Sequence, residues 1–437
     1  MRTRKSDASG AKTGKSSALR KFGCYLGQIP VLGWLLGSLV AVIIESTLSY
    51  PLARSLGLPN IPAIFGLRLV FTKPLLIPSA LLFVFIVYAV PIVLVAALTA
   101  SATNKLSGLL LKKFPMVVPV VIHLVFLYAI MHVWGSINDY RVLMLSFILV
   151  SIILTLSLNL VNGYMGEFSC SHPGFMALGA YGCSVLTLIF FVNDDLFGAA
   201  LLPQAWGPFL FPLCLIGGGI VASLGALVVA IPSFRTRGDY LAIISLAFTF
   251  IVKSLIENLE VIGGPRGLMN QPKFAGLPIV FVWMCLCVWV CVNFTRSIIG
   301  KAANAVRDNE TAADAMTINT RRTKMVTFLL AAFWAGVAGG LFAHIIGYIN
   351  PSTFGILKLS EVLAMVYLGG LNSVVGSIAG AVGLQFLMEI LRPLAMLKWI
   401  VIPVLLIIVM IRRPAGLISF TEFKVENIIR PRRKKER

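Results

Sequence analysis

Apolar runs long enough to cross a lipid bilayer recur along the chain and constrain its fold more than any other feature. A membrane-spanning helix needs about 17–25 predominantly apolar residues, and several of the runs carry no charge. The runs cover residues 75–99, 117–135, 144–161, 207–231, 277–294, 325–346 and 394–411. Hydrophobic residues make up 58% of the sequence and charged residues 12%, a composition that a water-soluble core cannot bury. The sequence therefore predicts an all-α, polytopic membrane helix bundle.

The basic charge follows membrane topology rather than nucleic-acid binding. The net charge is +20, and seven Lys/Arg lie in residues 1–21 and nine in residues 412–437. Basic clusters that flank apolar spans orient a protein in the membrane, and no base-stacking platform or recognition motif accompanies the charge. We therefore expect cytoplasmic N- and C-terminal tails, a lipid bilayer around the bundle and no nucleic-acid partner.

Placing the basic segments inside predicts roughly 10–12 transmembrane helices and a short cytoplasmic helix in the polar segment 295–324. The first span is expected at residues 29–44, before an external interfacial segment at 45–73. A basic loop with Lys105, Lys112 and Lys113 follows the span at 75–99. The glycine pair 369–370 leaves open whether residues 361–391 cross once or twice.

Neither a cofactor nor a metal site is predicted. Most of the seven cysteines lie in apolar runs, where Cys behaves as a small hydrophobe. Cys285, Cys287 and Cys291 lack nearby His or acidic partners for a metal. The segment 9–16 is similar to a phosphate-binding loop, but Ser9 stands where the first Gly belongs and no strand precedes it. We expect a disordered tail there, and no nucleotide site on this chain.

A polar, glycine-containing segment at 159–174 interrupts nearly continuous apolar sequence and is the candidate solute pathway. Irregular backbone at membrane depth is tolerated where protein buries it or where it lines a watery cavity, and transporters place broken helices on the solute path. An ordinary polar loop at the membrane face is the alternative. The candidate residues are Asn159, Asn162, Gly163, Gly166, Glu167, Ser169 and His172.

Two further segments break the apolar pattern. An external turn with Gly263, Gly264 and Gly267 can shape a vestibule, dock an external partner or simply join two helices. Before it, Lys253 and Glu257 stand four residues apart, so their charges are expected to neutralise each other on one helix face.

The second of these segments, residues 300–319, has helical amphipathic spacing. Ala302, Val306, Ala313 and Met316 are expected on one face, and Thr311 with Asp314 fits a capping box. Such a helix can transmit force from a motor subunit or lie passively at the interface.

Several motifs in order along residues 141–417 resemble the LivM-type permeases of branched-chain amino-acid ABC importers. They include Arg-Asp-Asn-Glu-Thr-Ala-Ala at 307–313, Gly-Val-Ala-Gly-Gly-Leu-Phe-Ala-His at 336–344 and Val-Tyr-Leu-Gly-Gly-Leu-Asn-Ser at 366–373. Further similar segments lie at 157–166, 173–181, 237–248 and 412–417. Two positions depart from the family pattern: Thr317 stands where a Gly usually precedes Ile-Asn, and Cys170-Ser171 replace Leu-Gly.

The resemblance implies a permease in the bacterial inner membrane. It also implies a homologous second permease subunit, cytoplasmic ATP-binding cassette subunits and a periplasmic solute-binding protein. ATP hydrolysis would then belong to a partner and not to this chain. The candidate residues of the ATPase-coupling helix are Arg307, Asp308, Asn309, Glu310, Ala312 and Ala313.

The domain plan that follows is a basic tail (1–28), an N-terminal membrane extension (29–140), a permease core (141–417) and a second basic tail (418–437). The expected solute is a branched-chain amino acid or a related small polar molecule. The competing hypothesis is an ion-coupled secondary transporter or channel, in which Glu257, Glu167 or His172 would move ions. An integral-membrane enzyme is disfavoured, because no nucleophile, base and orienting group occur together.

Overall fold

The computed structural model describes residues 29–55, 74–193, 198–234, 240–412, 416 and 418. The elements within these residues are helices, and an isolated β-bridge pairs Leu268 with Ile349. The terminal tails, the loop-like segment 9–16 and most of the predicted interfacial segment 45–73 lie outside the described residues.

Nine helices among the described residues are long and apolar enough to cross a membrane. This confirms the predicted all-α, polytopic helix bundle. The chain divides into two compact units, one before and one after the junction of Asn138 and Asp139, and each is described by itself.

The first unit contains three long helical segments. They are α2 (Val31–Ser55), the run of η2 (Pro74–Leu76), α4 (Ile77–Val84), η3 (Phe85–Ala89) and α5 (Val90–Lys113), and α6 (Val117–Gly135). Helix α2 packs against α5 and α6, and Ile29, Ala96 and Ala100 form a small buried cluster against Trp34.

Two boundaries in this unit differ from the prediction. Helix α2 does not end near residue 44 but continues through Pro51 to Ser55. A proline inside a helix removes one backbone hydrogen bond, and the helix can bend there and continue. Lys105, Lys112 and Lys113 belong to α5 and not to a loop. That helix ends where Phe114 becomes extended, immediately before Pro115, which disfavours the helical conformation of its neighbour.

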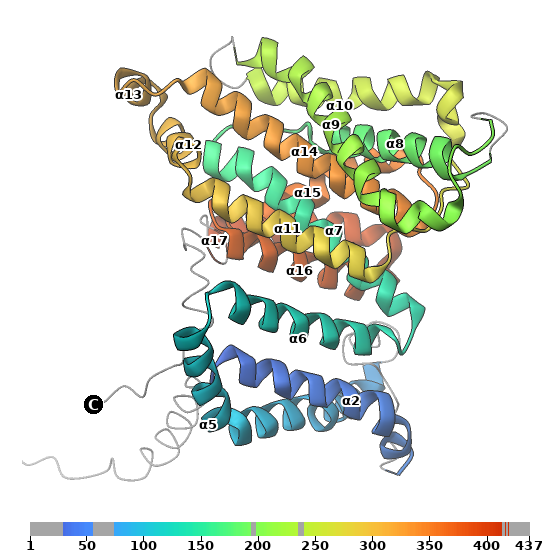
Figure 1. The fold of residues 1–437 in the computed structure, drawn as a ribbon, viewed down its shortest axis with the longest axis vertical. Coiled ribbons are helices and arrows are strands. Elements are labelled where there is room, and N and C mark those ends of the chain that lie inside the picture. Colours follow the sequence, from blue (N-terminus) through green and yellow to red (C-terminus); the bar gives the residue numbers. More distant parts are fainter. Residues whose placement is uncertain are drawn as a thin grey trace, which may run out of the picture. The chain divides into compact units, whose positions relative to one another are not determined.

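The second unit is built around α14 (Thr320–Ile346), which packs on α7 (Asp139–Asn159), α8 (His172–Phe191) and α9 (Gly207–Ser233) (Figure 1). Glycines permit this packing: a Cβ on Gly179 would overlap the backbone of Gly336, and one on Gly339 would overlap Met176. Close backbone approach at small residues is how helices associate in lipid, and these glycines form the seams between α14 and α8.

The remaining helices of this unit surround that centre. They are η4 (Leu160–Met165), η5 (Gln204–Trp206), α10 (Tyr240–Asn258), η6 (Glu260–Ile262), η7 (Gly264–Arg266), α11 (Leu277–Arg296), α12 (Ile298–Asp308), α13 (Glu310–Ala315), η8 (Pro351–Phe354), α15 (Ile356–Gly369), α16 (Val374–Ile390), η9 (Arg392–Leu397) and α17 (Lys398–Arg412). Helices α12 and α13 lie at the N-terminal end of α14, at the left of Figure 1.

Residues 361–391 form parts of two helices. Helices α15 and α16 pack on each other, and the turn between them contains Asn372 with a left-handed φ of 58°. At a rise of about 1.5 Å per residue, their lengths are about 21 and 26 Å, less than the ~30 Å hydrocarbon layer. The pair is a hairpin of short helices, which we call the α15–α16 hairpin.

Candidate functional site

The predicted break after Asn159 is present in the structure. Helix α7 passes into a single π-helical stretch, Leu160–Met165, which ends at Gly166 with a left-handed φ of 79°. The chain is then non-helical until α8 begins at His172. π-helical turns inside α-helices are frequent at functional sites, and here the turn opens an irregular segment between two membrane helices.

Asn159 joins the broken helix to the turn of the α15–α16 hairpin. Its Nδ2 donates to Ser373 O at 3.1 Å and to Ser377 Oγ at 2.6 Å, and its Oδ1 accepts from Asn372 N at 3.1 Å. A Cβ on Gly163 would overlap Asn159 Oδ1, so only glycine at position 163 leaves room for the Asn159 side chain. Because both ends of the Asn159 amide are occupied, the residue holds the backbone in place.

The irregular segment is fastened to α10 by hydrogen bonds. Cys170 N donates to Ser245 Oγ at 2.9 Å, and Thr249 Oγ1 donates to Cys170 O at 2.9 Å. Burial raises the pKa of the Cys170 thiol, which keeps it protonated and inert. Ser171 stands where the family pattern has Gly. Its φ of −84° is accessible to any residue, so the backbone does not require glycine at this position.

The remaining polar candidates of the break point inward. Asn162 Oδ1 accepts from Ser169 N at 3.2 Å, and Ser169 Oγ lies 2.8 Å from Ser171 Oγ. His172 is fully buried, with its ring against Phe175 at a centroid distance of 5.8 Å. These side chains stabilise the segment from within the protein, and His172 is enclosed rather than exposed.

A lysine that sequence reasoning did not single out connects this irregular segment to helix α13. Lys324 Nζ, on α14, lies 2.6 Å from Glu167 Oε1 and 2.9 Å from Glu310 Oε2. The side chain of Lys324 is only 10% exposed, whereas that of Glu310 is half exposed. A nearly buried cation therefore holds carboxylates from the break and from α13. We call Glu167, Lys324 and Glu310 the ion-pair relay.

Arg307 makes a second connection between the two segments. Its Nη1 donates to Gly163 O at 3.4 Å, and its Nη2 pairs with Asp308 Oδ1 at 2.7 Å. A Cβ on Gly166 would overlap the Arg307 side chain. The structure thus brings the predicted coupling residues into contact with the predicted pathway residues, although they are about 140 positions apart in the sequence.

The segment 300–319 contains two helices instead of one. Asn309 breaks it with an extended conformation and caps α13 by accepting from Ala312 N at 3.0 Å. The predicted capping box of Thr311 and Asp314 is therefore wrong, because Asn, one of the best N-caps, precedes them. Ala313 is buried but Met316 is 75% exposed, and Met316 lies after the last residue of α13, so the four apolar residues do not share one helix face.

The turn after α13 is closed by a strained residue. Ile318 N donates to Ala313 O at 3.1 Å, and Thr317 has a left-handed φ of 65°. This is the geometry for which helices usually employ glycine. Thr317 therefore adopts the left-handed conformation of this turn although the family pattern has Gly at this position.

The turn at 263–267, predicted to be external, is a defined element of the fold. Gly263, Gly264 and Gly267 all have positive φ, and Leu268 exchanges two backbone hydrogen bonds with Ile349, of 2.9 and 3.1 Å. Tyr348 Oη also donates to Arg266 O at 2.8 Å. The turn is joined to the segment that follows α14. The expected pair of Lys253 and Glu257 is present at 3.6 Å.

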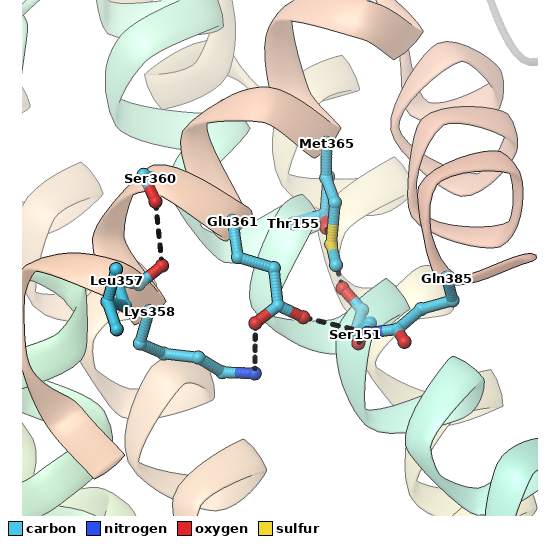
Figure 2. A network of polar contacts seen from close by, with 8 residues as sticks. All are labelled: Ser151, Thr155, Leu357, Lys358, Ser360, Glu361, Met365 and Gln385. Atoms are coloured by element: carbon cyan, nitrogen blue, oxygen red, sulfur yellow. Dashed lines mark hydrogen bonds and ion pairs between the residues drawn. The ribbon is translucent and has the colours of Figure 1, made fainter. Parts of the chain in front are cut away.

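A polar network inside the α15–α16 hairpin also escaped sequence reasoning. Lys358 Nζ donates to Glu361 Oε2 at 3.0 Å. Gln385 Nε2 donates to Glu361 Oε1 at 2.9 Å and to Ser151 Oγ, on α7, at 2.7 Å (Figure 2). The sequence did offer one signal, because Lys358 and Glu361 are charged residues at positions i and i+3 of an otherwise apolar helix. Their partner Gln385 is too distant in sequence to be recognised.

Comparison with known proteins decides the family. Residues 140–410 match the family described as the permease component of branched-chain amino acid transport systems. The chain belongs to this family. The matched range covers most of the second unit, including the broken helix, the ion-pair relay and the α15–α16 hairpin.

Individual relatives agree with this assignment. The chain is 30% identical over 316 residues to the high-affinity branched-chain amino acid transport system permease protein LivM of Escherichia coli K12, covering 64% of this chain and 70% of the relative. It is 22% identical over 284 residues to the permease protein LivH of Salmonella typhimurium, covering 62% and 91%. An autoinducer 2 import system permease protein, LsrC of an Enterobacter species, is 27% identical over 135 residues, covering 30% and 38%. No solved structure matches the chain.

These findings confirm the resemblance to LivM-type permeases. Together with the nine membrane-length helices of the described residues, they identify this family member as a multi-pass membrane protein that acts in transport.

Proposed function

We propose that this chain is the membrane-spanning permease subunit of an ATP-driven importer for a branched-chain amino acid or a related small polar solute. Membership of the permease family over residues 140–410 carries the proposal. The relatives named for branched-chain amino acid transport suggest the solute class.

The ion-pair relay supports a coupling mechanism. Helix α13 carries Glu310 on an accessible surface, and Lys324 connects it to Glu167 in the broken segment. A displacement of α13 by a partner would therefore pull on the break between α7 and α8. Because a nearly buried lysine that loses a carboxylate is costly, the relay favours movement of the two segments together.

The proposed partners follow from the two ends of the second unit. Cytoplasmic ATP-binding cassette subunits would dock at Arg307, Asp308, Asn309, Glu310, Ala312 and Ala313. A periplasmic solute-binding protein would dock near the turn of Gly263, Gly264 and Gly267. A homologous second permease subunit would complete the pathway within the bacterial inner membrane, and both termini would be cytoplasmic.

We further propose that residues 141–417 form the permease core and that residues 29–140 form an N-terminal membrane extension. The solute would pass beside the break, whose candidate residues are Asn159, Asn162, Gly163, Gly166, Glu167, Ser169 and His172. Asn159 would shape this path by holding its backbone through hydrogen bonds, and the buried His172 ring would fill space beside it.

The test is purification of the tagged chain from native membranes, followed by reconstitution of what is recovered into liposomes. Recovery of a second permease and an ATP-binding cassette subunit, with leucine uptake that needs ATP, is the expected result. A chain that purifies alone and transports on an ion gradient without ATP would instead establish the secondary transporter.

A further inference from the structure

A charged pair is enclosed within the α15–α16 hairpin, away from the ion-pair relay. The side chains of Lys358 and Glu361 are 13% and 10% exposed, and Gln385 and Ser151 complete the network (Figure 2). Ionisable residues within membrane bundles are expensive and mark the paths of substrates or ions. Packing of two short helices alone does not require them, since glycines already bring these helices together at Gly369 and Gly380.

A small cavity adjoins Glu361, the acidic member of this pair. It has a volume of about 160 Å³ and lies between α15, α16 and α17. Its walls are apolar except at Ser360 and Glu361, and the other lining residues are Leu363, Ala364, Met388, Trp399, Ile402, Pro403 and Leu406. An apolar cavity of about 150 Å³ accommodates a molecule as large as benzene, so a branched aliphatic side chain fits here.

The charged pair and the cavity are complementary to an α-amino acid. The Glu361 carboxylate can accept about four hydrogen bonds, and Lys358 and Gln385 use two of these positions. The ammonium of Lys358 has three donors, one of which goes to Glu361. A zwitterion can therefore place its ammonium on Glu361 and its carboxylate on Lys358 with charge-assisted hydrogen bonds.

The position of this pair suits entry of the solute rather than coupling to ATP. Lys358 and Glu361 lie in the first turns of α15, and Lys358 Nζ is 5.6 Å from the Phe342 ring centre near the C-terminal end of α14. The ion-pair relay lies at the opposite end of α14, at Lys324. The 27 residues of α14 therefore separate the two charged clusters.

We propose that Lys358, Glu361 and the adjoining cavity form a binding site for a zwitterionic α-amino acid with a branched apolar side chain. The site deepens the proposed function and rests on it, because it assigns that solute class to particular residues. Glu361 binds the ammonium group, Lys358 the carboxylate, and the cavity between α15, α16 and α17 the side chain.

The experiment measures binding of radiolabelled leucine to the purified complex in detergent, with no solute-binding protein present. Wild type is expected to bind leucine saturably. Glu361→Gln is expected to weaken binding by about tenfold or more, because an ammonium–carboxylate contact is lost. Glu389→Gln is the matched control: Glu389 lies on α16 with a side chain 13% exposed, outside the cavity lining, and is expected to leave leucine binding unchanged.

Two competitors test the division of charges. In wild type, 3-methylbutylamine lacks the carboxylate and 4-methylpentanoate lacks the ammonium, so each should compete about tenfold or more weakly than leucine. In Glu361→Gln, 3-methylbutylamine should no longer compete with leucine, whereas 4-methylpentanoate should compete as well as it does in wild type. Equal competition by both analogues in wild type and variant would overturn the assignment.

A second variant leaves the charges intact. Ala364→Leu fills part of the cavity, since Ala364 is buried and lines it, and should weaken leucine binding more than alanine binding. Protection of Met388→Cys from maleimide by leucine, read by mass spectrometry, should accompany binding. Unchanged leucine affinity in Glu361→Gln and Ala364→Leu, or no protection of Met388→Cys, would overturn the site. The proposed function is tested separately: ATP-dependent leucine uptake by a complex with a failed site refutes only this inference, whereas absent uptake refutes the function.

Discussion

The ammonium of Lys324 lies 2.6 Å from the carboxylate of Glu167, and this contact joins α14 to the irregular segment between α7 and α8. The same ammonium lies 2.9 Å from Glu310 on α13. The lysine belongs to the first turns of α14, the helix on which α7, α8 and α9 pack. A change at α13 therefore has a direct ionic route to the broken helix.

Reversing the charge of Glu310 should abolish ATP-driven uptake without preventing insertion. In Glu310→Lys two ammonium groups face each other where a 2.9 Å ion pair stood, so α13 is pushed away from α14. Insertion should survive, because Lys324 keeps its 2.6 Å contact to Glu167 and the Glu310 side chain is half exposed. Leucine uptake by the reconstituted complex and membrane expression together check this.

Asp314→Lys is the companion variant, because it reverses a charge on the same short helix at an exposed position. Its loss of uptake should be clearly smaller than that of Glu310→Lys. Equal losses in the two variants would show that surface charge on α13 matters rather than the contact to Lys324.

Asn159→Ala should destabilise the protein by about 1–3 kcal/mol, the cost of leaving buried hydrogen-bonding groups unsatisfied. The change removes the contacts to Ser373 O, Ser377 Oγ and Asn372 N that join α7 to the α15–α16 hairpin. Thermal unfolding of the detergent-solubilised protein measures it. Asn258→Ala removes an exposed amide that bonds only to its own helix and should alter stability little; an equal loss there would contradict this role of Asn159.

Thr317→Gly should stabilise the protein by about 1 kcal/mol, since a β-branched residue at positive φ is strained. The φ of Thr317 is 65°, which glycine adopts freely. Thr317→Ala keeps the Cβ and should gain much less. The thermal unfolding midpoints of the two variants provide the comparison, and a gain in Thr317→Ala that matched the glycine variant would point to loss of the hydroxyl instead.

The sequence predicts those features that depend on neighbouring residues. Uninterrupted apolar runs indicated the spans, and Gly163 and Gly166 indicated the break after Asn159. These predictions succeed because the length of a membrane span and the conformation of a glycine depend on residues that are close together in the sequence.

What the sequence did not predict depends on contacts between distant residues or on competing local signals. Lys324 and Glu167 are 157 positions apart, and Glu361 meets Gln385 only because the hairpin folds back on itself. Near Asn309 two capping signals compete, and the observed cap, Asn309, lies two residues before the predicted cap, Thr311. Lys105, Lys112 and Lys113 suggested a loop, whereas basic residues in a last turn also favour a helix end.

The most direct test of the coupling account is Lys324→Met in the reconstituted complex, with leucine uptake and ATP hydrolysis measured on the same liposomes. The account predicts that hydrolysis persists while uptake falls by about tenfold or more, and that Lys324→Arg, which keeps the cation, retains most of the uptake. Uptake per ATP equal to wild type in Lys324→Met would show that α13 drives the pathway without the ion-pair relay, and would contradict the account.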